Sequence, residues 1–249
     1  MSAPREPGRR DSGERCVLVT GAGRGLGRAI ALHLARPGTL LFLHHHASGD
    51  GARDAAGEAE AKGARAVALG ADLADPAARE RLMAELARRS GALHVLVNNA
   101  GIYPQRGLLD TSAAEWQRVL DVTCSAVFHL TQLALPLLRA GAPARVVNLG
   151  DSAADRVSAH TAATPYHVAK LGVHVLTRSF AAALAPQRIT VNQLSPGFLE
   201  NSVGEPGSPV PAGRLGTFAD VLAALDFLLD PAAEYVTGAN LVVGGGWNL

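Results

Sequence analysis

Lysine is nearly missing from this chain of 249 residues. Only Lys62 and Lys170 stand among its 23 basic side chains, and arginine supplies the rest. Because arginine serves wherever a general cation is needed, a retained lysine suggests a task for a compact ammonium, such as shifting the pKa of a neighbour. Tyrosine is also rare, with three in the chain, and Tyr166 precedes Lys170 by four residues. On a helix this spacing places both side chains on one face, where the cation favours the phenolate needed for acid–base chemistry.

Cysteine, net charge and long apolar runs are scarce too, and each scarcity excludes a class of protein. The two cysteines, Cys16 and Cys124, are isolated in an expected strand and an expected helix. They indicate buried thiols in a reducing compartment, hence a cytoplasmic protein, and exclude a disulfide framework. A net charge of +1 gives no reason to expect nucleic-acid or membrane binding. No apolar run of about 18 residues predicts a transmembrane helix.

The remaining pattern is that of one α/β domain. Short apolar runs alternate with longer helical segments, which predicts a doubly wound parallel sheet with helices on both faces. Residues 1–14 are polar and rich in Arg, Gly and Pro, without the apolar region of a signal peptide, and we expect a disordered tail there. The domain is expected over residues 15–249, without a repeat or a second domain.

A glycine-rich turn lies at the start of this domain. Cys16-Val17-Leu18-Val19 reads as a strand, Gly21-Ala22-Gly23-Arg24-Gly25-Leu26-Gly27 as the turn, and the apolar period that follows as a helix. Glycines let the backbone approach a pyrophosphate, and a helix N-terminus offers free N–H groups to it. The strand–turn–helix context makes a dinucleotide site the favoured interpretation.

The end of the second strand, expected over 39–43, bears on the choice of dinucleotide. His44-His45-His46-Ala47-Ser48 follows it and contains no acidic residue that would bind the 2′-hydroxyl of NAD. Arg24, His46 and Ser48 suit the 2′-phosphate of NADP, so NADP(H) is favoured over NAD(H). A metal site is disfavoured, because consecutive strand residues point to opposite faces.

Five motifs in order give the chain a resemblance to the short-chain dehydrogenase/reductase family. They are the glycine turn, Asp72-Leu73, Asn98-Asn99-Ala100-Gly101, Tyr166-x-x-x-Lys170 and Ser195-Pro196-Gly197. The resemblance implies a Rossmann-type core of about seven parallel strands and hydride transfer between a nicotinamide and a substrate. It also implies cofactor contacts at Gly21, Arg24, Gly25, Leu26, Gly27, His46, Ser48, Asp72, Leu73, Asn99, Ala100, Gly101, Tyr166, Lys170, Pro196 and Gly197.

Two catalytic positions depart from the common family pattern. The family usually has a serine after the fifth strand, where this chain has Asp151 followed by Ser152. Aspartate at this position is similar to pteridine reductases, although Ala47 replaces the arginine of that branch. Asp151 is slightly favoured, and Ser152 remains the alternative because the spacing to Tyr166 is longer than usual. Thr123 stands where the family usually has asparagine, which predicts a weakened proton relay.

A Pro- and Gly-rich segment, residues 198–216, is expected to form a mobile lid over the substrate, with Asn201 or Ser202 as a cofactor contact. Tyr103, His160 and Trp247 are candidates for the pocket lining. Each is equally consistent with ordinary packing.

The resulting hypothesis is an NADPH-dependent reductase of a carbonyl or a pterin-like ring. Tyr166 would be the general acid, Lys170 would lower its pKa, and Asp151 or Ser152 would position the substrate. A 3-oxoacyl-carrier-protein reductase or a ketone reductase is the alternative, with an acyl carrier protein as partner and Arg106, Arg139, Arg145 and Arg156 as scattered basic residues. A cofactor-binding sensor that has lost catalysis is the alternative from another class. By resemblance, we expect a homodimer or homotetramer.

Overall fold

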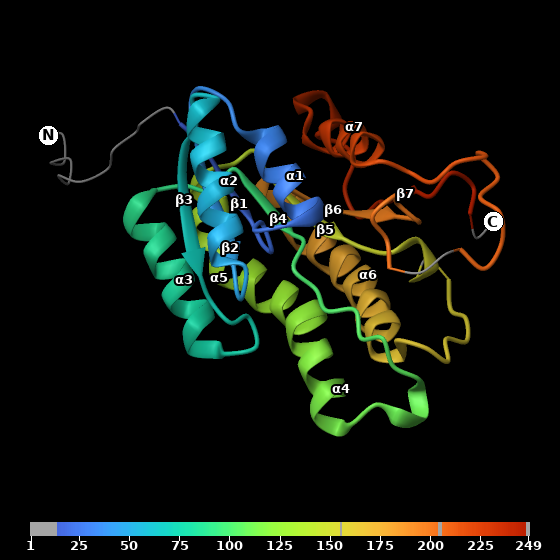
Figure 1. The fold of residues 1–249 in the computed structure, drawn as a ribbon. Helices are drawn as coiled ribbons and strands as arrows, with labels where there is room; N and C mark the ends of the chain where they lie inside the picture. The colour runs from blue at the N-terminus through green and yellow to red at the C-terminus, as the bar shows by residue number, and fades with distance from the viewer. Residues whose placement is uncertain (1–13, 155, 204–205, 248–249) are drawn as a thin grey trace, which may run out of the picture.

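The computed structural model describes residues 14–154, 156–203 and 206–247. All of the expected tail except Glu14 therefore lies outside the described residues, as do Asp155, Gly204, Glu205, Asn248 and Leu249. Seven parallel strands form one sheet in the order β3-β2-β1-β4-β5-β6-β7 (Figure 1). Their bounds are β1 Arg15–Val19, β2 Thr39–His45, β3 Arg65–Gly70, β4 Val95–Asn98, β5 Ala144–Leu149, β6 Ile189–Pro196 and β7 Asn240–Val243.

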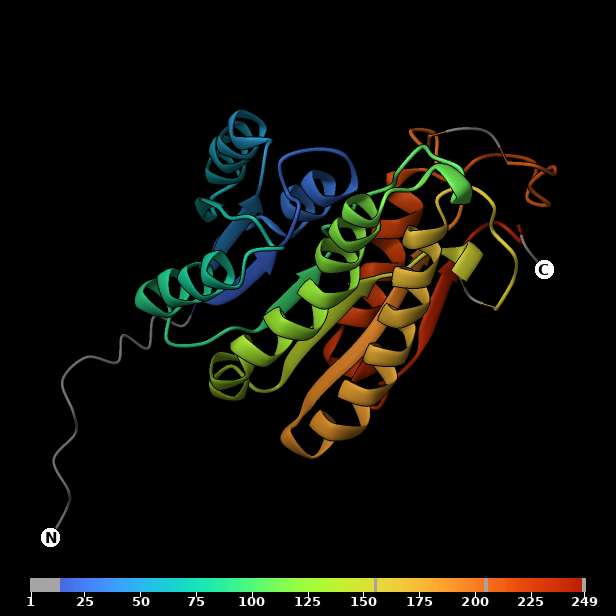
Figure 2. The same cartoon turned by 90° about the horizontal axis from the view of Figure 1, so that it is seen from below.

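Helices cover both faces of the sheet, as the alternating pattern predicts. The helices are α1 Gly25–Leu34, α2 Gly49–Ala61, α3 Pro76–Arg89, α4 Ala113–Leu120, α5 Ala126–Ala140, α6 Thr164–Leu184 and α7 Phe218–Leu229. A π-helical turn, Asp121–Ser125, joins α4 to α5. In Figure 2 the continuous α4–α5 segment and α6 lie side by side across one face. The predicted Rossmann-type doubly wound fold is confirmed.

Two apolar cores result from the alternation of side chains along the strands. In β1, Val17 and Val19 pack with α1, α2 and α7, whereas Cys16 and Leu18 pack with α3, α5 and α6. Both faces are buried, so the strands read as continuous apolar runs. Burying apolar surface on both faces fixes the register of each strand, because a slip of one residue would exchange the two cores.

Two helical segments contradict the expectation that no segment is long and apolar enough to span a membrane. By length and composition alone, residues 113–140 and 164–187 would both suffice. They pack against each other and against the sheet, and their apolar side chains contribute Leu130, Ala134, Leu138, Ala181 and Leu184 to the second core. The expectation failed because these apolar residues are interspersed with polar ones and form no uninterrupted run. Core packing accounts for part of their hydropathy, while Phe128, Leu133, Val168 and Val175 remain exposed.

All strands being parallel, their C-terminal ends lie along one edge of the sheet. The glycine turn follows β1, Asp72 follows β3, the Asn-Asn-Ala-Gly segment follows β4, and Asp151 follows β5. Segments separated by more than a hundred residues are thereby brought to one edge, which is where open α/β sheets bind their ligands.

Candidate active site

The glycine turn after β1 makes a backbone cradle that side chains would fill. Gly21 and Gly25 have φ of +66° and +56°, in the left-handed region. A Cβ at Gly27 would stand 2.2 Å from the Gly21 carbonyl oxygen, and one at Gly23 would stand 2.2 Å from Ser48 Oγ. The first turn of α1 has no acidic residue and no side-chain cap, so its N–H groups remain open to a phosphate. The turn fits a dinucleotide pyrophosphate.

His44 fastens this turn to the neighbouring strands, a role that the sequence did not reveal. The ring is buried, its Nδ1 accepts the Gly21 N–H at 3.2 Å, and its Nε2 lies 3.1 Å from the Ala71 carbonyl oxygen. The second contact requires Nε2 to carry the proton. Burial lowers the pKa of His44 to about 4, so the ring is neutral at physiological pH. His44, near the end of β2, therefore links this strand to the segments after β1 and β3.

Exposed polar groups surround the expected position of the adenosine ribose. Arg24 and His46 are exposed and Ser48 is half-buried. None of the three is in an ion pair among the described residues. The Arg24 guanidinium and the His46 ring are therefore open to a phosphate.

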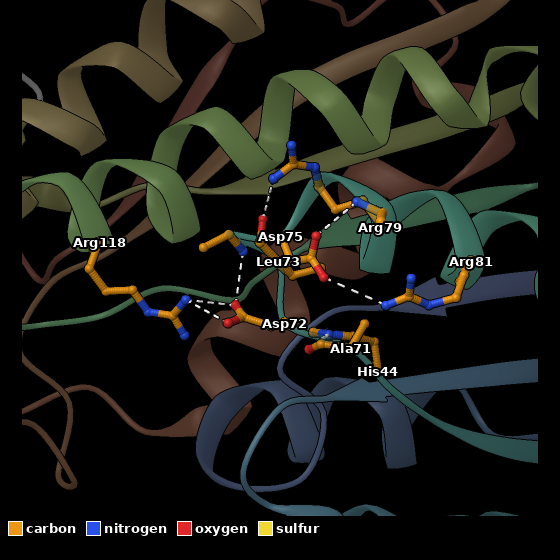
Figure 3. Close-up of polar contacts among 10 residues, drawn as sticks. His44, Ala71, Asp72, Leu73, Asp75, Arg79, Arg81 and Arg118 are labelled. Atoms are coloured by element: carbon orange, nitrogen blue, oxygen red, sulfur yellow. Dashed lines mark hydrogen bonds and ion pairs between the residues drawn. The ribbon is translucent and has the colours of Figure 1, made fainter.

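Asp72, expected to meet the adenine ring, is held by a residue that the sequence did not single out. Arg118 Nη1 of α4 donates to Asp72 Oδ1 and Oδ2 at 2.7 and 2.8 Å, and the Ala74 N–H donates to Oδ1 at 2.9 Å (Figure 3). Burial opposes ionisation of Asp72, but these hydrogen bonds more than offset it and lower its pKa. The ion pair fixes a planar guanidinium beside the Asp72 carboxylate.

Arg79 of α3 binds the neighbouring Leu73 rather than Asp72 itself. Its Nη1 donates to the Leu73 carbonyl oxygen at 2.6 Å, and the guanidinium is buried (Figure 3). Asp75 caps α3 by accepting the Ala77 N–H at 2.9 Å. The Leu73 carbonyl oxygen and the Asp75 carboxylate thus hold the segment after β3 in place through contacts within the protein.

The Asn-Asn-Ala-Gly segment after β4 supports the glycine turn from below. Asn99 Nδ2 donates to the Thr20 and Gly21 carbonyl oxygens at 2.8 and 3.3 Å. Thr20 Oγ1 accepts the N–H groups of Asn99 and Ala100 at 2.9 and 3.0 Å. The Asn99 amide is therefore committed to the turn, and Asn99 shapes the cofactor site from behind. Ala100 and Gly101 line the continuation of this edge.

Tyr166, Lys170 and Asp151 meet at the end of β5. Tyr166 and Lys170 lie one turn apart on α6, as their spacing predicts. Tyr166 Oη donates to Asp151 Oδ2 at 2.8 Å. The ammonium of Lys170 is buried, donates to the Leu149 carbonyl oxygen at 2.6 Å, and lies 5.4 Å from the centre of the Tyr166 ring. The three titratable groups form one hydrogen-bonded and electrostatically coupled cluster.

The pKa of Tyr166 is not shifted in the expected direction. Burial, the Asp151 charge and the hydrogen bond to Asp151 raise the pKa of Tyr166 well above its ordinary value. Burial lowers the pKa of Lys170 to about 8, against the attraction of Asp151. The expected lowering of the phenol pKa by Lys170 is therefore wrong for this structure, because burial of the phenol and the adjacent Asp151 carboxylate both favour its neutral form.

Ser152, the alternative to Asp151, faces a different neighbour. It is 2 % exposed, and a Cβ at Gly197 would stand 3.4 Å from its Oγ. Asp151 Oδ1 accepts the Ala153 N–H at 2.7 Å, which fixes the carboxylate toward Tyr166. Of the two candidates, Asp151 is the one in contact with the tyrosine hydroxyl. Gly197 continues β6 by donating its N–H to the Val243 carbonyl oxygen at 2.9 Å, and Pro196 precedes it.

Thr123 lies in the π-helical turn, next to the lysine. It is buried, and its Oγ1 accepts the Ile102 N–H at 3.1 Å. A Cβ at Gly101 would stand 3.5 Å from Thr123 Cγ2 and 3.9 Å from Lys170 Nζ, so the three groups adjoin. π-Helical turns inside α-helices occur frequently at functional sites. Thr123 thus lies beside Lys170, where the relay is expected, and its Oγ1 already accepts one hydrogen bond, from the Ile102 N–H.

Aromatic rings surround Tyr166 on the outer side. The half-exposed ring of Tyr103 meets the Tyr166 ring edge-on at 5.0 Å between centroids. His160 stacks on His167 at 3.6 Å, and the imidazole of His160 lies 2.9 Å from Ser158 Oγ. The expected pocket residues Tyr103 and His160 therefore lie near Tyr166, the first in direct contact with it and the second through His167.

Trp247 contacts the segment that is expected to form the lid. It packs edge-on against Phe198 at 4.8 Å between centroids. The two ends of the lid, residues 198–216, are joined by hydrogen bonds between Gly216 and both Phe198 and Glu200. Ser202 Oγ accepts the Leu199 N–H at 2.9 Å, whereas Asn201 faces Gly25 of the glycine turn. Of the two proposed cofactor contacts, Asn201 is the one nearer to the phosphate cradle.

Two basic residues of the expected set lie away from the pocket mouth. Arg139 is in the last turn of α5, shortly before β5 begins, and its Nε donates to Gln187 Oε1 at 2.6 Å. Arg145 is buried at the start of β5, at the edge of the sheet opposite to the active site. Arg106 is near the mouth but pairs with Glu115 at 3.1 Å. No continuous basic surface follows from these residues.

Known proteins resemble this chain over nearly its whole length. The matching family model is described as enoyl-(acyl carrier protein) reductase and covers residues 21–248. A 3-oxoacyl-[acyl-carrier-protein] reductase of Staphylococcus aureus is 33 % identical over 241 residues, which cover 93 % of this chain and 97 % of that protein. An L-rhamnose 1-dehydrogenase of Azotobacter vinelandii is 34 % identical and covers 94 % and 96 %.

Solved structures agree with these relatives. A short-chain dehydrogenase of Burkholderia cenocepacia in complex with NADP superimposes with a TM-score of 0.86 at 32 % identity, over 95 % of this chain and 98 % of that one. The acetoin dehydrogenase of Salmonella typhimurium gives a TM-score of 0.84 at 29 % identity, over 94 % and 96 %. The chain is an oxidoreductase that belongs to the short-chain dehydrogenase/reductase family.

Proposed function

We propose that the protein is an NADP(H)-dependent reductase that delivers a hydride to a pterin-like ring. The observation that carries this proposal is the hydrogen bond from Tyr166 Oη to Asp151 Oδ2, at 2.8 Å. An ionised carboxylate only accepts hydrogen bonds and carries the same charge as a developing alkoxide. Asp151 would therefore oppose the oxyanion formed from a ketone, where a serine hydroxyl would stabilise it.

A pterin-like ring matches this site because its reducible bond is C=N and its ring carries N–H groups. Hydride adds to the carbon, a proton adds to the nitrogen, and no oxyanion forms. Asp151 accepts a ring N–H or the exocyclic amine, and Tyr166 gives its proton to the reduced nitrogen. The phenol is protonated at neutral pH, as a general acid must be, since even the ordinary tyrosine pKa of about 10 lies well above 7 and burial raises the pKa of Tyr166 further. Tyr103 beside Tyr166 offers a ring edge to a flat substrate.

Cofactor binding is assigned to the cradle described above. The reduced nicotinamide, when bound, supplies the hydride. The glycine turn and the first turn of α1 would hold the pyrophosphate, Arg24, His46 and Ser48 the 2′-phosphate, and Asp72 with Arg118 the adenine. Lys170 would bind the nicotinamide ribose, next to Pro196 and Gly197. The absence of a carboxylate at residues 44–48 supports NADP(H) over NAD(H).

Reduction of a 3-oxoacyl thioester is the second candidate, and the relatives favour it. Several of them are named as reductases of that class and match more than nine-tenths of this chain. An acyl carrier protein would then be the partner. The scattered arginines and the carboxylate of Asp151 weigh against this reaction.

Self-association and a cytoplasmic location complete the proposal. Phe128 and Leu133 of α5 and Val168 and Val175 of α6 are apolar and exposed. Pairing of these helices between subunits would cover them, as the family resemblance implies. Size-exclusion chromatography with light scattering would measure a dimer or a tetramer if this pairing forms.

The test is NADPH oxidation by the purified protein with a dihydropterin, an acetoacetyl thioester and a diketone, and with NADH in parallel. Turnover of the dihydropterin above the other two supports the proposal. Thioester turnover alone would replace it with the second candidate. Silence with all three, together with tight NADPH binding, would instead favour a cofactor-binding sensor.

A further inference from the structure

A cavity of about 640 Å³ lies at the edge of the sheet opposite to the active site. Its lining comes from the N-terminal ends of the strands: Arg15 begins β1, Arg145 is the second residue of β5, and His94 immediately precedes β4. Arg36, in the loop before β2, and the end of α7 complete the wall. None of the residues assigned to the cofactor or the substrate reaches this cavity.

Three arginines line the cavity without a carboxylate partner. Neither Arg15, Arg36 nor Arg145 is in an ion pair within the part of the chain that the structure describes. Arg145 is only 5 % exposed, and its Nε is buried without a hydrogen-bond partner among the described residues. A buried guanidinium in this state is costly, because its donors have lost water and gained little in return.

The arginines also repel one another. Burial, followed by the charges of Arg36 and Arg145, lowers the pKa of Arg15. His94 adds a further donor: its Nδ1 accepts the Cys16 N–H at 2.9 Å, so the neutral ring carries its proton on Nε2. The cavity is therefore lined by three guanidinium groups and by one imidazole N–H.

Acidic residues of the same cavity are engaged elsewhere. Asp226 Oδ1 lies 2.8 Å from His33 Nε2, and Glu234 pairs with Arg188 at 3.1 Å. Asp230 caps the following turn by accepting the Ala232 N–H at 2.7 Å. Their charges still act on the cavity, since Glu234 and Asp230 favour the charged form of Arg145 and Asp226 that of Arg15, but none of the three is in an ion pair with an arginine of the cavity among the described residues.

We propose that this cavity binds a phosphate-type oxyanion, either free phosphate or the phosphate group of a small metabolite. A tetrahedral dianion accepts several hydrogen bonds at once, which matches three guanidinium groups and one imidazole N–H. Its charge would relieve the repulsion among the arginines and give Arg145 Nε a partner. The site is independent of the proposed reaction, since it uses the other edge of the sheet.

The experiment is calorimetric titration of the full chain, saturated with NADP⁺, with inorganic phosphate at pH 7.5. Chloride at equal ionic strength measures the general salt effect. Arg36→Gln and Arg15→Gln remove one cation each at exposed or half-buried positions, and Arg53→Gln, on the surface of α2, is the matched control. We expect each cavity variant to weaken phosphate binding at least about tenfold, and the control to leave it unchanged. A melting scan should show a rise in Tm of roughly 3–5 °C at phosphate ten times above its Kd, lost in the same variants.

Three outcomes would overturn the proposal. They are no heat above the chloride control, phosphate binding by both cavity variants that is as tight as in the parent protein, and binding that appears only when NADP⁺ is left out. The last would place phosphate in the glycine cradle. A second titration with a sugar phosphate separates the two sources. Tighter binding than inorganic phosphate, with the same loss in Arg36→Gln, identifies a metabolite; weaker binding identifies free phosphate.

Discussion

Replacing Asp151 by serine should convert the site from one that accepts hydrogen bonds to one that donates them. The carboxylate accepts from Tyr166 at 2.8 Å in the structure. A hydrogen bond to a charged group contributes about 1.5–3 kcal/mol, and 1.4 kcal/mol is a factor of ten, so dihydropterin turnover should fall roughly 10- to 100-fold. One added donor to an oxyanion is worth roughly 10²–10³ in kcat, so reduction of a diketone should rise. The ratio of the two kcat/KM values should shift by roughly 10³ or more.

The variant Asp151→Asn distinguishes the effect of the negative charge of this side chain from the effect of its shape. The amide keeps the size of the side chain and an acceptor for the Tyr166 hydroxyl, but removes the negative charge that raises the pKa of Tyr166. A spectrophotometric titration of the phenol should therefore show a lower pKa than in the parent protein. Both variants should keep their affinity for NADPH, because Asp151 lies outside the glycine cradle.

Ser152→Ala is the matched control, one residue along the chain. If it changes the substrate ratio as much as Asp151→Ser does, the proton would be handled by Ser152 and the assignment fails. An unchanged ratio in Asp151→Ser would refute the electrostatic reasoning itself. Thermal melting of each variant excludes a change in folding as the cause.

Four further predictions concern the cofactor site and the acid. Tyr166→Phe should lose nearly all turnover and keep NADPH binding, measured by steady-state kinetics and fluorescence titration; residual activity near that of the parent would exclude Tyr166 as the acid. Gly27→Ala should abolish NADPH binding, because its Cβ would stand 2.2 Å from the Gly21 carbonyl oxygen. The control is Gly57→Ala, on the open side of α2, which should bind NADPH normally and gain about 0.5–1 kcal/mol of stability. Arg118→Ala should weaken the binding of NADPH and of 2′,5′-ADP by roughly tenfold, because the arginine orders only the adenine side of the site. The binding of reduced nicotinamide mononucleotide should not change, and a loss equal to that of 2′,5′-ADP would contradict this role of Arg118. The Lys170 ammonium, with its pKa of about 8, is present below that pH and lost above it, so reductive kcat/KM should fall about tenfold per unit above pH 8, and a profile flat to pH 10 would disprove the role.

Sequence patterns were sufficient for the fold because it depends on features that repeat along the chain. The alternation of apolar runs and helices predicts the parallel sheet, and parallel strands bring their C-terminal ends together whatever the details. Tyr166 and Lys170 could be paired because helix geometry alone relates residues four apart. The glycine turn could be placed because it lies between a strand and a helix.

Contacts that join distant segments could not be predicted in the same way. The expected shift of the Tyr166 pKa failed because its sign depends on the burial of the phenol and on the contact with Asp151, and spacing in sequence gives neither. Arg118 meets Asp72 across 46 residues, and nothing local marks it among so many other arginines. The choice between Asp151 and Ser152 depended on the path of a single turn after β5.

His44 has a consequence for attempts to change the cofactor preference of this enzyme. Both of its ring nitrogens are committed, one to Gly21 and the other to Ala71. A substitution there would loosen three loops together, and any change in selectivity would be confounded by a loss of affinity for every dinucleotide. His46, two residues on, is exposed, and its side chain is not part of this framework. If the enzyme prefers NADP(H), as proposed, an acidic residue introduced at His46 would redirect it toward NAD(H), while the ring of His44 keeps the binding site assembled.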